Sequence, residues 1–137
     1  MFNKRFTKEQ LKLLRQWAKA LRSGKYAQTQ EVLCRVGDDK TRSFCCLGVL
    51  CDMVDTKRWK EDPFMDRLSW FGLTGIPPHS TLKRFGLSDA EALEFVDLND
   101  DHSATFEEIA EVIDWIVLSG DRYTPSMGRL GRLGNDD

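Results

Sequence analysis

The chain lacks a long apolar run and lacks an excess of charge of either sign. No stretch approaches the roughly 18 consecutive apolar residues of a membrane-spanning helix. Its 20 Lys and Arg nearly balance its 22 Asp and Glu, which leaves a formal charge of −2. Such a balance gives no general attraction to nucleic acid or to an anionic membrane. Residues 1–6 show no apolar signal-peptide segment, so we expect a cytoplasmic protein with neither kind of partner.

The sequence also lacks the motifs of several enzyme classes. It contains no Gly-x-Ser-x-Gly elbow, no Gly-x4-Gly-Lys-Ser/Thr phosphate loop, no Gly-x-Gly-x2-Gly turn and no His-Glu-x2-His pair. His79 and His102 are its two histidines, which leaves few centres for histidine-based acid–base chemistry. We therefore predict no catalytic residue and no cofactor. Whether the chain is an enzyme stays open, and a non-catalytic role is favoured.

Four cysteines lie between positions 34 and 51, at Cys34, Cys45, Cys46 and Cys51. No Cys-x2-Cys knuckle is present, and the neighbouring residues are apolar. Without a secretion signal, reduced and buried thiols are the favoured interpretation. A zinc site and a catalytic thiol are the alternatives.

The length of 137 residues and the 41% hydrophobic content fit one domain with its own core. We expect a globular part over residues 1–120. Residues 121–137 are rich in Gly and Arg, with Gly128, Gly131 and Gly134 in regular spacing. They are predicted to form a flexible tail, and an arm that docks on a partner is the alternative.

Capping boxes predict three helices, over residues 7–23, 88–96 and 105–118. Alternating apolar residues predict a hairpin with strands at 31–36 and 41–46. Residues 47–54 favour a short buried helix, and residues 55–76 suggest a second, irregular hairpin. A short helical turn should end at Gly86.

Together these elements predict an α+β fold, in which a small antiparallel sheet of one or two hairpins packs against three or four helices. The predicted core consists of Leu14, Trp17, Leu21, Phe44, Leu47, Leu50, Phe106, Ile109 and Ile113.

The segment between the last two predicted helices has the oxygen spacing of a calcium loop. Asp97, Asn99, Asp101 and Glu108 would occupy positions one, three, five and twelve. His102 stands at position six, which turns sharply and is normally Gly. We predict no metal site, and these four residues are the ones that would form one. The alternative is an acidic loop in which Glu108 completes a helix cap.

Residues 22–30 combine a guanidinium, a glycine, an aromatic ring and two amides, which suit a phosphate, a ribose and a base. The alternative is a helix C-terminus whose cations are favoured by the helix dipole. Trp59 and Trp70 could frame a pocket, although core packing is also consistent with their sequence context. The predicted ligand contacts are Arg22, Ser23, Tyr26, Gln28, Trp59, Trp70, Asn99 and Asp100.

Three segments, ALRSGKYAQ at residues 20–28, FCCLGVLCD at 44–52, and LND at 98–100 with TFEEIA at 105–110, carry a resemblance. Together they resemble a widespread family of small bacteriophage and prophage proteins of uncharacterised function. The resemblance covers about residues 10–118 and implies a phage protein that works inside a bacterial cell. It supplies no activity and no catalytic residues.

Such a protein could bind and withhold a host-derived ligand, for example a nucleotide immune signal, and thereby act against host defence. The alternatives are a module that binds or inhibits a host protein, a small nucleotide hydrolase and a calcium-binding helix-loop-helix. The expected partners are a nucleotide-like small molecule or a host protein. A homodimer could form through the tail or through Trp115, and nothing in the sequence fixes it.

Overall fold

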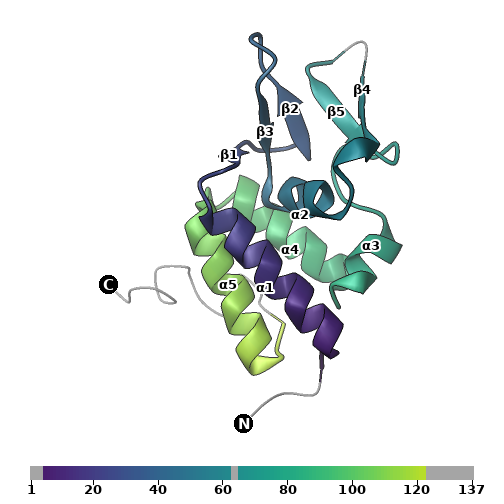
Figure 1. Ribbon diagram of the computed structural model, residues 1–137. Helices are drawn as coiled ribbons and strands as arrows, with labels where there is room; N and C mark the ends of the chain where they lie inside the picture. The colour runs from purple at the N-terminus through teal and green to yellow at the C-terminus, as the bar shows by residue number, and fades with distance from the viewer. Residues whose placement is uncertain (1–4, 63–64, 123–137) are drawn as a thin grey trace.

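A computed structural model describes residues 5–62 and 65–122 of the chain. The fold is a single α+β domain, as predicted, in which a mixed sheet stands at one end of a helical body (Figure 1). The predicted flexible tail lies outside the described residues, except for Asp121 and Arg122. Within the described residues, no helix is long and apolar enough to cross a membrane.

Helices α1 (Lys8–Arg22), α4 (Asp89–Asp100) and α5 (Phe106–Ser119) confirm the three predictions from capping boxes. Each begins where a Thr or Ser hydroxyl accepts a hydrogen bond from the third backbone N–H of the helix. Helix α4 continues past its predicted end at residue 96, because Leu98 and Asn99 bury their side chains in the interior. Helix α5 ends at Gly120, whose φ of 76° closes the last turn.

The sheet has the strand order β1-β3-β2-β5-β4 among the described residues. Its strands are β1 (Ala27–Gln28), β2 (Cys34–Val36), β3 (Arg42–Phe44), β4 (Trp59–Glu61) and β5 (Arg67–Trp70). Both predicted hairpins are present, as β2–β3 and β4–β5. The expectation of a purely antiparallel sheet was wrong in one detail, because β1 pairs parallel to β3. No strand is predicted for the two residues that form β1.

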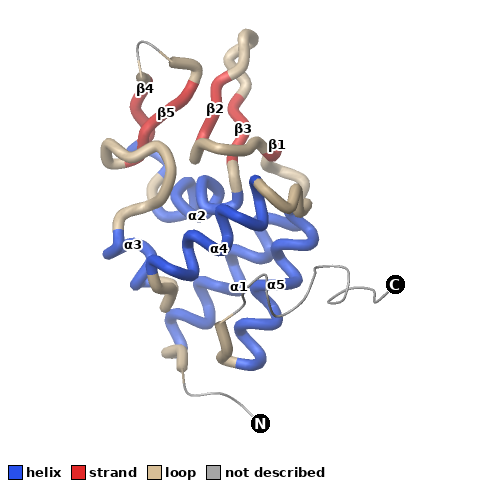
Figure 2. Tube along the Cα trace, turned by 180° about the vertical axis from the view of Figure 1, so that it is seen from behind, coloured by secondary structure: helices blue, strands red, loops and turns tan. Residues whose placement is uncertain are grey.

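Three further helical segments complete the fold: α2 (Cys46–Val54), the 3-10 turn η1 (Thr56–Arg58) and α3 (His79–Arg84). They bring the described α-helices to five, where three or four were expected. The predicted short helix over 47–54 is confirmed by α2, which lies between the sheet and the other helices (Figures 1 and 2). Its residues from Cys46 to Cys51 are all buried.

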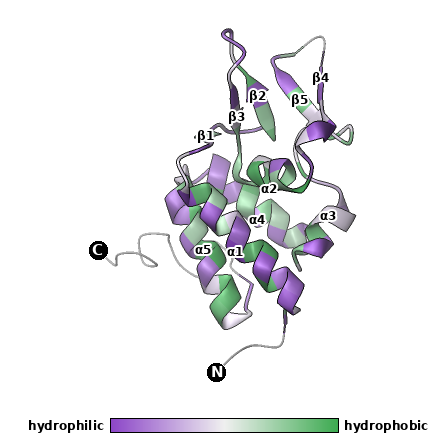
Figure 3. Cartoon of the chain, viewed as in Figure 1, coloured by the Kyte–Doolittle hydropathy of each residue, from purple (hydrophilic) through white to green (hydrophobic). Residues whose placement is uncertain are grey.

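One hydrophobic cluster joins the five described α-helices and strands β2 to β5, and it contains every predicted core residue. Within it, the indole N–H of Trp17 on α1 donates to the carbonyl oxygen of Cys46 at 2.9 Å. Figure 3 shows hydrophobic residues concentrated among the helices, whereas the outer ends of the two hairpins are largely hydrophilic. The helical body therefore supplies most of the hydrophobic stabilisation.

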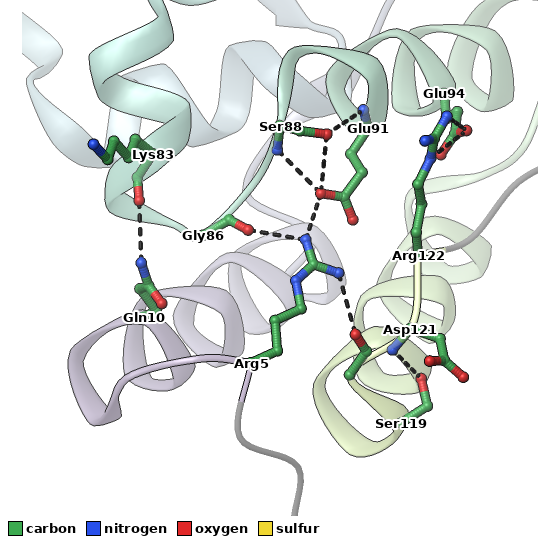
Figure 4. Close-up of polar contacts among 11 residues, drawn as sticks. Arg5, Gln10, Lys83, Gly86, Ser88, Glu91, Glu94, Ser119, Asp121 and Arg122 are labelled. Carbon is green, nitrogen blue, oxygen red and sulfur yellow. Dashed lines mark hydrogen bonds and ion pairs between the residues drawn. The ribbon is translucent and has the colours of Figure 1, made fainter.

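Arg5 ties the two ends of the described chain to α4 (Figure 4). Its guanidinium donates to the carboxylate of Glu91, to the carbonyl oxygen of Gly86 at 2.9 Å and to that of Gly120 at 3.4 Å. The Glu91 side chain is only 3% exposed. Arg122, at the other end, pairs with Glu94 at 2.6 Å.

Replacing Arg5 with alanine should lower the free energy of unfolding by about 3 kcal/mol, because the Glu91 carboxylate would stay buried without its cation. Urea denaturation should show a lower midpoint with an unchanged slope. The matched control is Arg15→Ala, at an exposed position on α1, where we expect a change within about 0.5 kcal/mol. Equal effects of the two substitutions would contradict the role of Arg5.

Candidate functional site

A groove of about 600 Å³ lies where the C-terminal end of α1 meets the C-terminal half of α2. We call it the α1–α2 groove. Its volume falls in the range of small-molecule sites. Its walls are Gln16, Lys19, Ala20, Ser23, Lys25, Tyr26, Asp52, Met53 and Thr56.

Asp52 organises one wall of this groove. Its carboxylate accepts hydrogen bonds from the Tyr26 hydroxyl at 2.8 Å, the Thr56 hydroxyl at 2.8 Å and the Trp59 indole N–H at 3.0 Å. The Tyr26 ring also packs edge-on against Phe44, with 5.1 Å between ring centroids. Burial, together with the hydrogen bond to Asp52, raises the pKa of Tyr26 well above its usual value. The Tyr26 ring is thus held in place before any ligand arrives.

Sequence reasoning missed Asp52, although it ends the distinctive run at residues 44–52. A signal was available: a carboxylate that closes an otherwise apolar helix needs hydrogen-bond donors close by. What the sequence could not show was that Tyr26, which precedes Asp52 by 26 residues, and Trp59, which follows α2, would both supply them.

The charges that line the groove are those of Lys19, Lys25 and Asp52, and the carboxylate of Asp52 already accepts three hydrogen bonds. The Lys25 ammonium lies 5.6 Å from the centroid of the Tyr26 ring. Ser23, a predicted contact, donates to the carbonyl oxygen of Ala20 at 2.6 Å and accepts from the Lys25 backbone N–H at 3.1 Å. The two lysines are therefore the groups that would meet an anion, beside the apolar surface of Ala20 and Met53.

Arg22, predicted to contact an anionic group, lies outside the residues that line the groove. Its guanidinium pairs with Asp114 at 2.7 Å and with Glu107 at 3.3 Å, both on α5. The hydrogen bond that Arg22 donates to the Asp114 carboxylate raises the pKa of the guanidinium above its usual value. Arg22 thus fastens α1 to α5, and its contact with a ligand stays a prediction.

Gln28, Asn99 and Asp100 are brought together by the fold, but they bind one another. The Gln28 amide donates to Asn99 Oδ1 at 2.9 Å and to the carbonyl oxygen of Ala104 at 2.8 Å. Asn99 Oδ1 also accepts from the Cys46 backbone N–H at 3.2 Å. Its Nδ2 donates to the Thr29 carbonyl oxygen and to Asp100 Oδ1, each at 2.9 Å. This Asn99 network joins α4 to β1 and α2, which is a structural role.

Trp59 and Trp70 lie in the interior, 9% and 0% exposed, and neither lines the groove. Their ring centroids are 6.5 Å apart, and the Trp70 indole N–H donates to the carbonyl oxygen of Asp55. Phe44 packs against Trp59, and Phe71 packs against Trp70. With Tyr26, these rings form a continuous aromatic row from the groove to the far end of β5.

The possible calcium ligands are placed on separate parts of the α4–α5 connection. Asp97 and Asn99 still belong to α4, so the backbone cannot curl around an ion there, and Asn99 is committed to its own network. Glu108 accepts from the Thr105 N–H in a capping box, as the alternative interpretation expected. A hydrogen bond with Asp97 raises the pKa of Asp101. Across residues 5–62 and 65–122, no group of three or more Cys, His, Asp or Glu could hold a metal.

All four cysteines are free and buried, which confirms the predicted burial of these thiols. Burial raises the pKa of Cys34 and of Cys45 to about 12 and raises those of Cys46 and Cys51 as well. A thiol must ionise to act as a nucleophile, so these environments disfavour the catalytic-thiol alternative. Cys45 instead caps α2, since its sulfur accepts from the Gly48 N–H at 3.4 Å.

Comparison with known proteins adds one relationship. Residues 8–70 match the model of a family described as a domain of unknown function, DUF8296. No curated protein and no solved structure matches the chain. The matched segment runs from α1 to β5, so it carries every residue that lines the α1–α2 groove.

Proposed function

We propose that this protein is a non-catalytic binder that holds an anionic, nucleotide-like small molecule in the α1–α2 groove. The proposal rests on one observation: Lys19 and Lys25 line the same groove as the Tyr26 ring, whose hydroxyl is hydrogen-bonded to Asp52. Holding a contact group in its binding position before association reduces the entropy lost when a ligand binds.

The groove offers a distinct contact to each part of a nucleotide. The ammonium groups of Lys19 and Lys25 suit phosphate oxygens, to which they donate charge-assisted hydrogen bonds. The Tyr26 ring and the Met53 side chain offer surface to a base. Gln16 adds an amide that can donate to or accept from polar edges of the ligand.

The resemblance to phage proteins supports a proposal for the wider role. We propose that the protein acts in the cytoplasm of a bacterial host and withholds a host-derived ligand, such as a nucleotide immune signal. A sequestering protein needs a groove and affinity rather than a nucleophile. The raised pKa values of the four buried thiols agree with that requirement.

A thermal-shift screen against nucleotides, cyclic nucleotides and ADP-ribose derivatives tests the proposal. A ligand at 100 times its dissociation constant adds about 2.7 kcal/mol of stability, which corresponds to a shift of several degrees for a domain of this size. Lys19→Gln/Lys25→Gln should weaken binding at least about tenfold in calorimetry, because both charge-assisted contacts are lost. The control, Lys8→Gln/Lys12→Gln, removes two exposed lysines of α1 that do not line the groove.

Three results would contradict the proposal. The first is a flat response to every compound, which would favour the host-protein alternative. The second is binding that the Lys19→Gln/Lys25→Gln variant leaves unchanged. The third is conversion of the bound compound to a product, seen by chromatography of the same mixture, which would make the protein a hydrolase.

A further inference from the structure

A second groove, of about 420 Å³, lies beside the β4–β5 hairpin. We call it the hairpin groove, and it is lined by Lys57, Arg58, Lys60, Ser69, Phe71 and Gly72. Every charged residue in its lining is a cation. The turn η1 contributes to both grooves. Its Thr56 lines the first, and its Lys57 and Arg58 line the second.

The strand register explains why this groove is polar and open. Trp59 pairs with Trp70, and the next pair along the hairpin is Lys60 with Ser69. Successive side chains of a strand point to opposite faces, so burial of the tryptophans turns Lys60 and Ser69 outward. Strand β4 is also an edge strand of the described sheet, so it pairs with β5 on one side and with no described strand on the other.

Phe71 holds an unusual position beside this groove. It sits with Gly72 in a two-residue turn, which is closed by hydrogen bonds between Trp70 and Leu73 at 2.8 and 3.0 Å. The φ angles of Phe71 and Gly72 are 50° and 80°. A turn with two positive φ angles favours Asn-Gly, and a bulky residue at the first position is strained. The Phe71 side chain is nevertheless 53% exposed.

Neighbouring groups fix the orientation of the Phe71 ring. The Trp70 ring meets it at 87°, with 4.7 Å between centroids, and the Arg58 guanidinium lies 4.9 Å from its centroid. Arg58 is also paired with Asp55 at 3.0 Å. Among the described residues, no carboxylate is within ion-pair distance of Lys57 or Lys60. The Asp55 carboxylate lies close enough to Lys57 for their charges to interact, although the two form no ion pair. The groove therefore combines two lysines that have no ion-pair partner among the described residues with a strained, exposed aromatic ring.

We propose that the hairpin groove binds single-stranded nucleic acid, with backbone phosphates on Lys57 and Lys60 and a base stacked against Phe71. Cations along an open groove and an exposed aromatic ring are the two features that sequence-tolerant single-strand sites share. Strain and solvent exposure at one residue, both unfavourable for folding, are expected where a functional contact requires them. The near-neutral charge of the whole chain does not oppose this site, because the cations are gathered locally.

Fluorescence anisotropy with a labelled 15-nucleotide single strand, at several salt concentrations, tests this proposal on the full chain. Two phosphate contacts predict a slope of about −1.4 in log K against log salt concentration. Lys57→Gln/Lys60→Gln should bring that slope close to zero. The matched control, Lys83→Gln/Arg84→Gln, removes two exposed cations of α3 and should leave the slope unchanged.

A second variant separates binding from folding. Phe71→Asn places a residue suited to positive φ in the turn, so its melting temperature should equal or exceed that of the parent. Its affinity for the strand should nevertheless fall about fivefold or more, since the stacking surface is lost. A loss of affinity in a fully folded variant would support a binding role for Phe71.

Several outcomes would overturn the proposal: no binding at 50 mM salt, equal affinity for double-stranded DNA, or equal affinity for a single free nucleotide. Unchanged binding by Phe71→Asn would do the same. Loss of strand binding in Lys19→Gln/Lys25→Gln, with the hairpin variants unaffected, would assign the strand to the α1–α2 groove. Because the two grooves use different residues, failure of one proposal leaves the other standing.

Discussion

Replacing Gly48 with alanine should destabilise the domain by about 4 kcal/mol or more, a large part of the stability of a domain of this size. A Cβ atom at Gly48 would lie 1.9 Å from the carbonyl oxygen of Leu33 and 2.8 Å from its carbonyl carbon. Both are backbone atoms of the segment that leads into β2, so no side-chain rotation can relieve the overlap. Helix α2 would have to move away from the sheet, and the core would open with it.

Urea denaturation measures this effect, and Gly75→Ala provides its control. A Cβ atom at Gly75 would meet nothing within 4 Å. We therefore expect Gly75→Ala to stay within about 1 kcal/mol of the parent. If Gly48→Ala were as stable as Gly75→Ala, the close approach of α2 to Leu33 would be disproved.

The distinctive run at residues 44–52 has a structural explanation. Cys45 caps α2, Cys46 donates its N–H to Asn99, Gly48 allows the close approach to Leu33, and Asp52 holds Tyr26. Each of these four residues makes a packing or hydrogen-bonding contact that holds α2 in place. A specific sequence motif can thus reflect the packing at the centre of a fold.

Sequence patterns that span a few residues predicted those elements whose stabilising contacts also lie within a few residues. The three capping boxes at Thr7, Ser88 and Thr105 predicted the long helices because each box is satisfied within one turn. The nine predicted core residues are all buried: eight lie on helices, whose apolar faces pack inward, and Phe44 lies on β3. Gly86 likewise ends α3 with a φ of 76°.

The same patterns could not predict features that depend on contacts between residues far apart along the chain. The pairing of β1 with β3 depends on residues at 27–28 meeting residues at 43–44, and no periodicity in a two-residue strand reveals it. The hydrogen bond between Gln28 and Asn99 likewise joins residues 71 positions apart, which no local pattern predicts, and the contact of either residue with a ligand stays a prediction. Lys19 and Lys25 were not singled out, because only the tertiary structure places them in one groove with Asp52.

Asn99→Ala should lower the free energy of unfolding by about 4 kcal/mol. Asn99 is 0% exposed and makes hydrogen bonds to α2, β1 and the segment that follows it. Its removal would leave the Cys46 N–H and the Thr29 carbonyl oxygen without those bonds, and each buried, unpaired polar group costs about 1–3 kcal/mol. A small cavity adds to the loss. The exposed Asp101→Ala, at the end of the same helix, should change stability by less than about 1 kcal/mol.

Asn99→Asp distinguishes the hydrogen-bond network from simple packing, because it preserves the shape of the side chain. At pH 7 it would place a buried carboxylate beside Asp100 and opposite the Thr29 carbonyl oxygen, which removes the donor and adds repulsion. The pKa of the introduced carboxyl would be raised in the folded state by burial and by Asp100. Relative to the parent, the destabilisation should therefore be largest above that folded-state pKa and diminish as the pH falls through it, when the protonated group can donate again. Urea denaturation at pH 7 and pH 5 measures the difference, and a loss of stability that is identical at both values would show that the amide donor is not what the fold requires.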